Sequence, residues 1–136
     1  MAGENAGGVK TITPSGLAPP GGHYSHMTVA NGLVFISGLL PITPDGTRLV
    51  DASFEEQVNQ VLANLKTALL AADSSIDQLV QVRVYIDSID NWPTFNTIYA
   101  AWAGNARPAR AVVPTGPLHF GLKVEIEGVA LASPAG

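Results

Sequence analysis

The alternation of apolar and polar positions predicts a chain of short strands interrupted by two helices. Residues 27–30 and 33–37 are apolar and rich in β-forming residues. They are joined by Asn31-Gly32, and Asn-Gly is the strongest short hairpin signal. Further strands are predicted at residues 9–13, 79–87, 111–113 and 122–131. Within 79–87 the residues predicted to face the core are Val80, Val82, Val84 and Ile86.

The period of the apolar residues changes after Ser53, where a helix is expected to begin. Ser53 and Glu56 have the spacing of a capping box, and an apolar stripe then runs from Phe54 to Ala72, about five turns of helix. A second helix is predicted to begin near Pro93, because proline is favoured in a first helical turn. Its inward-facing residues are predicted to be Phe95, Ile98, Tyr99 and Trp102.

The order of these elements, β-β-β-α-β-α-β-β, predicts an α+β domain with both helices on one face of a sheet. We take residues 1–136 as a single domain. Residues 1–8 and 133–136 are small and polar, and we expect them to be flexible ends.

The composition adds an expectation about assembly. Charged residues make up 13% of the chain, about half the usual ~25%, whereas 46% of the residues are hydrophobic. So few charges cannot coat a monomer's surface, which favours a symmetric homo-oligomer. No apolar run approaches the ~20 residues of a membrane helix, and the N-terminus lacks a basic segment and an apolar signal core. The expected location is therefore cytoplasmic, away from membranes.

Two absences narrow the chemistry. The chain has no cysteine, which excludes disulfides, thiolate nucleophiles and cysteine-ligated metals. The net charge is −4, and the chain contains no block of basic residues, which disfavours a nucleic-acid partner. Walker, GxGxxG, GxSxG and HExxH motifs are also missing, so the usual nucleotide and hydrolase-triad sites are not expected.

Candidate chemistry is concentrated near the C-terminus. Glu125 and Glu127 share one face of a predicted strand, so two carboxylates project side by side. Arg107 and Arg110 flank Pro108, which stiffens the approach to the second arginine. A fixed guanidinium grips a carboxylate through two hydrogen bonds, as a site for a small keto or imino acid requires. Taken alone, these residues are better explained by a solvent-facing strand edge and a surface ion pair.

The three histidines give weaker indications. His23 and His26 lie three residues apart, and side chains at that spacing on extended chain point to opposite faces. A shared metal is therefore not expected, and packing within the loop is favoured. His119 lies in a Pro/Gly loop, where a general-base role competes with ordinary packing, and packing is again favoured.

Five motifs in register resemble those of the Rid family, the reactive-intermediate deaminases also called YjgF-like proteins. The resemblance spans about residues 9–132. In chain order the motifs are G-H-Y-S-H, L-V-F-I-S-G-x-x-P, F-N-T-I-Y, R-P-A-R-A-V-V and K-V-E-I-E-G-V-A. It implies a chorismate-mutase-like α+β fold assembled as a homotrimer, with small-molecule clefts between subunits. It also implies hydrolysis of 2-imino acids, or enamine tautomers such as 2-aminoacrylate, to 2-keto acids and ammonia, without a metal or organic cofactor.

The resemblance assigns catalytic roles to two residues. The family's substrate-carboxylate arginine corresponds to Arg110, and its water-orienting glutamate corresponds to Glu125. Arg107 and Glu127 are not the matching residues. On this interpretation Arg110 holds the substrate, while Glu125, on a neighbouring strand, takes a proton from the attacking water.

Four further positions are assigned to substrate binding by the same resemblance. The family's cleft tyrosine corresponds to Tyr24, its strand serine to Ser37 and its helix asparagine to Asn96. Val112 replaces a frequent cysteine, and Leu39 replaces a frequent glutamine, which predicts a more apolar cleft mouth.

Two other functions remain open at this point. One is a regulatory trimer that binds small metabolites in the same cleft without catalysis. The other is a ribonuclease, an activity also attributed to some members of the family. The acidic balance and the lack of a basic aromatic stripe disfavour the ribonuclease.

Overall fold

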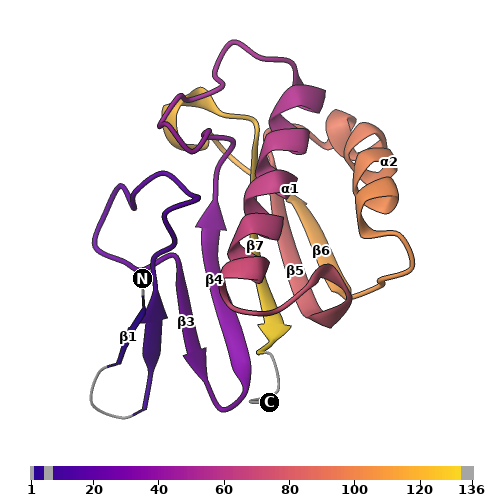
Figure 1. The fold of residues 1–136 in the computed structure, drawn as a ribbon. Coiled ribbons are helices and arrows are strands. Elements are labelled where there is room, and N and C mark those ends of the chain that lie inside the picture. The colour runs from indigo at the N-terminus through magenta and orange to yellow at the C-terminus, as the bar shows by residue number, and fades with distance from the viewer. Residues whose placement is uncertain (1, 5–7, 133–136) are drawn as a thin grey trace.

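The computed structural model describes residues 2–4 and 8–132 and builds them into one mixed sheet with two helices (Figure 1). The strands are β1 (Ala2–Glu4), β2 (Lys10–Ile12), β3 (Met27–Ala30), β4 (Leu33–Leu39), β5 (Leu79–Ile86), β6 (Ala109–Pro114) and β7 (Val124–Leu131). The helices are α1 (Phe54–Ala71) and α2 (Trp92–Ala103), and short 3₁₀ turns lie at Ile76–Gln78, Ile89–Asn91 and His119–Gly121.

The strands lie in the order β1-β2-β3-β4-β7-β5-β6 across the sheet. Neighbouring strands are antiparallel, except that β5 and β6 are parallel and are connected through α2. Figure 1 shows α1 and α2 on the same side of the sheet. This is the α+β class, with both helices on one face, that the order of elements predicted.

Both helices follow from local sequence features. The Ser53 hydroxyl oxygen accepts from the backbone N–H of Glu56 at 3.1 Å, which confirms the predicted cap of α1. Pro93 lies in the first turn of α2, as expected. The helices bury their apolar stripes against the sheet. The central core residues are Met27, Val34, Ile36, Val58, Val61, Leu62, Leu65, Leu69, Val82, Val84, Ile86, Phe95, Val124 and Ile126.

The β3–β4 hairpin also forms as predicted. Ala30 pairs with Leu33 across a two-residue turn, and Asn31 and Gly32 both have positive φ, 52° and 77°. These are the left-handed values that a type I′ turn requires, and Asn and Gly adopt them most readily.

The alternation predicted for residues 79–87 is wrong at Val80. Val82, Val84 and Ile86 are buried, but Val80 is 44% exposed. The reason is an irregularity in the pairing of β5 with β7 between Leu79 and Gln81, which shifts the alternation by one position. Gly128 pairs with Val82 next to this irregularity, and a Cβ at residue 128 would be 3.2 Å from the Gln81 carbonyl oxygen.

Strand β1 was not predicted. Ala2–Glu4 fall within the expected flexible end, yet they pair with β2 from Ala2↔Ile12 to Glu4↔Lys10. Alanine, glycine and glutamate have low strand propensity, so pairing along the outer side of β2 defines this strand rather than any apolar pattern. The remaining positions of the predicted ends, 1, 5–7 and 133–136, lie outside the described residues.

The face of the sheet opposite the helices carries exposed apolar side chains. Phe35 on β4 and Val113 on β6 are 44% and 42% exposed. Among the described residues, no helix is long and apolar enough to cross a membrane.

Candidate active site

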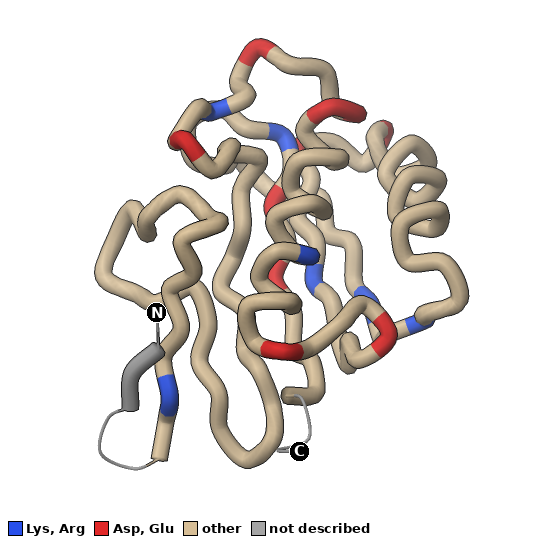
Figure 2. The backbone as a smooth tube through the Cα atoms, viewed as in Figure 1, with Lys and Arg blue, Asp and Glu red and all other residues tan. Residues whose placement is uncertain are grey.

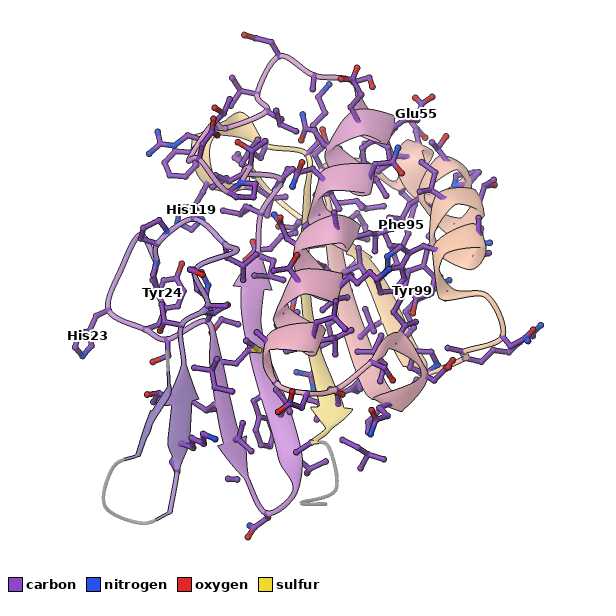
Figure 3. All side chains as sticks on the ribbon, viewed as in Figure 1. His23, Tyr24, Glu55, Phe95, Tyr99 and His119 are labelled. Carbon is purple, nitrogen blue, oxygen red and sulfur yellow. The ribbon has the colours of Figure 1, made fainter. Side chains whose placement is uncertain are left out.

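A cavity of about 580 Å³ opens beside the end of β4. It is lined by the loop at 17–26, the end of β4 with the chain up to 48, the turn at 119–120, and single residues of α1 and β7, Asn64 and Glu125. Figure 3 labels Tyr24 and His119, which belong to two of these segments. A volume of this size suits a small metabolite.

Glu125 supplies a carboxylate to the wall of this cavity. It alternates along β7 with the buried Val124 and Ile126, so its side chain leaves the sheet on the face opposite the helices. Burial raises the pKa of the Glu125 carboxyl above its ordinary value, the charge of His119 lowers this pKa, and the charge of Glu127 raises it. The net effect is a raised pKa, so the ionised Glu125 carboxylate accepts a proton more readily than an exposed glutamate does.

Gly38 makes room for that carboxylate. A Cβ at residue 38 would collide with the Glu125 oxygen Oε2 and would lie 3.2 Å from Glu125 Cδ. Residues 37 and 38 fall in an irregularity of the β4–β7 pairing between Ile36 and Leu39, which opens this part of the ladder. The glycine and the bulge together let the Glu125 side chain lie directly against the β4 backbone.

Ser37 and Tyr24 line the same cavity as Glu125. The Ser37 hydroxyl donates to the Ser25 carbonyl oxygen at 2.7 Å, and this bond ties β4 to the loop that carries Tyr24. Tyr24 is 48% exposed, and its hydroxyl oxygen accepts from the Gly21 N–H at 3.4 Å. The structure therefore brings together three of the six predicted site residues. Leu39, predicted to make the mouth more apolar, is also part of the lining.

The histidine pair of the sequence motif separates in the structure. His26 is buried, and its Nε2 lies 2.7 Å from the Ala18 carbonyl oxygen, which confirms its expected packing role in the loop. His23 is exposed and points away from the body of the protein (Figure 3). No group of three histidine, aspartate or glutamate side chains suited to a metal ion occurs among the described residues.

The other three predicted residues lie elsewhere. Arg110 and Val112 on β6 are in register with the buried Val82 and Val84, so they face the helix side of the sheet. The Arg110 guanidinium carbon lies 5.0 Å from the centre of the Tyr99 ring, which α2 supplies. Asn96 precedes Tyr99 by one helical turn. We call Arg110, Val112 and Asn96 the edge group, and Tyr24, Ser37 and Glu125 the cavity group.

The expectation that Glu125 projects from a strand next to Arg110 is wrong. Strand β5 lies between β6 and β7. On β5, Tyr85 pairs with Glu125 and Val82 pairs with Arg110, and these two β5 residues face opposite sides of the sheet. Within one chain the two groups therefore cannot contact the same small molecule.

Sequence analysis missed three residues around these groups. Arg48 and Phe120 line the cavity, and the Arg48 guanidinium carbon lies 3.6 Å from the centre of the Phe120 ring. Tyr99 was predicted only as a core residue, but it also contacts Arg110. Its hydroxyl is the buried side-chain polar atom left without a hydrogen-bond partner among the described residues, and burial raises its pKa. The signal in the sequence that pointed to this part of α2 was Asn96, the predicted site residue one turn before Tyr99.

Comparisons with known proteins agree with this architecture. Residues 15–132 match the family model described as Endoribonuclease L-PSP. Protein HMF1 of Saccharomyces cerevisiae is 35% identical over 125 residues, which cover 90% of this chain and 96% of the relative. The chain belongs to the Rid (YjgF/L-PSP) family.

Other members of the Rid family carry more specific names. The chloroplastic Reactive Intermediate Deaminase A of Arabidopsis thaliana is 33% identical over 117 residues, covering 86% of this chain and 60% of that protein. The crystal structure of E. coli TdcF with bound serine superposes with a TM-score of 0.84 at 25% identity, covering 90% of this chain and 98% of that one. Because relatives occur in organelles, the cytoplasmic location of this Rid protein stays a prediction.

Proposed function

We propose that this Rid protein hydrolyses 2-imino acids and their enamine tautomers to 2-keto acids and ammonia. The observation that carries the proposal is a partly buried carboxylate, Glu125, with a raised pKa on the wall of a metabolite-sized cavity. Membership of a family that includes a reactive intermediate deaminase supports it, as does a structural relative that holds an amino acid.

The chemistry requires a held substrate and one positioned water molecule. A protonated imine carbon is electrophilic, so Glu125 takes a proton from water as the oxygen attacks that carbon. Glu125 returns this proton to the nitrogen of the resulting carbinolamine, the C–N bond breaks to release ammonia, and the hydroxyl group loses its proton to water as the carbonyl of the keto acid forms. Arg110 binds the substrate carboxylate through two parallel hydrogen bonds and fixes the imine carbon in place.

The positions of these residues make assembly part of the proposal. Arg110 and Glu125 lie on different faces of one sheet, so a second copy must bring its edge group to the cavity group of the first. A homotrimer satisfies this requirement in a closed ring and would also cover the apolar face that carries Phe35 and Val113.

The test is to generate imino acids in situ with an amino-acid oxidase and to measure keto-acid release. We expect acceleration by the wild-type protein and none by a Glu125→Gln variant that assembles normally. Calorimetric titration with a keto-acid product separates binding from turnover. Tight binding without any acceleration would replace the deaminase with the regulatory, metabolite-binding trimer.

A ribonuclease is the less favoured alternative despite the description of the family model. Figure 2 shows lysine and arginine scattered singly along the chain, with no continuous basic track. A nucleic-acid groove combines such a track with stacking aromatic residues. Fluorescence titration with labelled RNA at physiological salt should therefore detect no binding.

A further inference from the structure

Arg48 and Phe120 form a cationic lip on the cavity. Arg48 follows the turn at 43–47, and its guanidinium carbon lies 3.6 Å from the centre of the Phe120 ring. Both side chains line the cavity that contains Glu125. Stacking occupies the flat face of the guanidinium and leaves its N–H groups, which lie in the plane of the fork, available to a ligand.

The charge of Arg48 has no counter-ion in the part of the chain that the structure describes. The ion pair found there joins Arg83 to Glu127, and the Arg48 guanidinium donates no hydrogen bond to another described residue. The charges that act on the Glu125 carboxyl are those of His119 and Glu127. Arg48 reaches the cavity from the chain that follows β4, whereas Glu125 reaches it from β7.

The lip is held from both sides by local structure. Residues 42 and 48 form an isolated antiparallel bridge, and the Thr43 N–H donates to the Thr47 carbonyl oxygen at 2.9 Å. Buried Asn64 fixes the same segment by donating to the Leu40 and Ile42 carbonyl oxygens at 3.0 and 2.9 Å. These bonds fix the backbone that carries Arg48, while its side chain is exposed at the rim of the cavity.

Phe120 adopts an unusual backbone conformation to reach this position. Its φ is 62° and its ψ is 10°, in the left-handed region that large non-glycine residues seldom occupy. Its ring is nevertheless 49% exposed, so burial of the ring does not compensate for the conformation. Such outliers concentrate where a side chain serves a binding site.

We propose that Arg48 binds a second carboxylate at the far end of the substrate, so that dicarboxylic imino acids are the preferred substrate class. This inference rests on the proposed deaminase function and deepens it. Arg110 of another copy takes the α-carboxylate, and the reaction at the imine carbon stays beside Glu125. A second anion near the Glu125 carboxylate would be repelled unless a cation met it, and Arg48 is the one lysine or arginine that lines this cavity among the described residues. We take the second anion to be a carboxylate because imino acids derive from amino acids, and the acidic side chains of amino acids are carboxylates.

Binding of product analogues tests the inference without depending on turnover. The two probes are 2-oxoglutarate and 5-methyl-2-oxohexanoate, which have the same chain but end in a carboxylate and in an isopropyl group of similar size. Calorimetry measures both dissociation constants for the wild type and for Arg48→Gln, Arg48→Lys and Arg107→Gln. Arg107 is the matched control because it is an exposed arginine outside the cavity lining.

We expect the wild type to favour 2-oxoglutarate, and Arg48→Gln to reduce that preference by about tenfold or more, since charge-assisted hydrogen bonds are lost. Arg48→Lys should restore part of the preference because it keeps the charge but not the planar fork. Arg107→Gln should keep the wild-type ratio. Thermal melting of each variant confirms that it is folded.

Three outcomes distinguish failure of the dicarboxylate inference from failure of the proposed deaminase function. Binding of both probes with no preference for 2-oxoglutarate overturns the dicarboxylate assignment and leaves the deaminase intact. A preference that survives Arg48→Gln unchanged overturns the role of Arg48. If the wild type binds neither probe, the inference falls together with the proposed metabolite site.

Discussion

Arg110 and Arg107 lie three residues apart in the same motif, but their environments differ. Arg110 is partly buried above the Tyr99 ring, whereas Arg107 is exposed. Each charge-assisted hydrogen bond contributes ~1.5–3 kcal/mol, so Arg110→Ala should reduce keto-acid release by about 10²-fold or more. Arg110→Lys should also be poor because an ammonium group lacks the planar fork. Arg107→Ala is the matched control. If it proved the more damaging change, Arg110 would not be the substrate arginine.

Glu125 links activity to stability through its pKa. Because that pKa is raised, the folded chain holds the proton more tightly than the unfolded chain. As pH rises from the ordinary value of 4.5 towards the raised value, the unfolded chain ionises first and the free energy of unfolding falls. Glu125→Gln does not ionise, so it should melt at a higher temperature than the wild type at neutral pH while losing turnover.

Calorimetric melting of both proteins from pH 4 to pH 8 tests this difference in stability. The gap between Glu125→Gln and the wild type should widen as pH rises and close below about pH 4, where both side chains are neutral. A gap that stays constant across this range would mean that burial does not penalise the Glu125 charge.

Glu127 does not match the family's glutamate, yet its contacts differ from those of an ordinary surface residue. Its carboxylate accepts a hydrogen bond from the Tyr85 hydroxyl and lies 4.0 Å from Arg83. That hydrogen bond is the main cause of the raised pKa of Tyr85. The sequence places Glu125 and Glu127 on one face of a strand. It does not show that the two carboxylates have different neighbours, because those neighbours come from β4 and β5.

At the scale of elements, the irregular end of β4 determines where Glu125 lies. Gly38→Ala should displace the Glu125 carboxylate, since the new Cβ would occupy its position. We expect turnover to fall by about tenfold or more, with a smaller change in product affinity, because the water-activating group moves while Arg110 stays. Gly116→Ala is the control, as a Cβ at residue 116 has nothing within 4 Å. Equal activity of both alanine variants would contradict the proposed role of Gly38.

The elements that sequence predicts best are those whose determinants are local. The cap at Ser53 and the turn at Asn31-Gly32 involve adjacent residues, and both form as expected. The exposure of Val80 depends on how β5 pairs with β7, so the local alternation was misleading there. The position of β1 depends on its pairing with β2, and its own sequence has no apolar pattern that would predict a strand. Arg48 and Phe120 are 72 positions apart in sequence, and no short motif connects such residues.

For the whole molecule, the apolar open face and the divided site both predict a trimer. Light scattering on the purified protein should give about three times 14.1 kDa. Phe35→Glu would place a charge on the open face, where Phe35 is 44% exposed, and should lower that mass. A stable, active monomer at micromolar concentration would contradict both the trimer and a site shared between copies.

The division of the site between two faces of one sheet has a genetic consequence. A chain with Arg110→Ala keeps its cavity group, and a chain with Glu125→Gln keeps its edge group. Two alleles that are inactive alone should therefore complement each other when co-expressed. Random assembly in a ring pairs an intact cavity group with an intact edge group at about a quarter of the sites. Differently tagged chains allow mixed trimers to be purified and assayed. Mixed trimers without recovered activity would mean that each chain builds its own site.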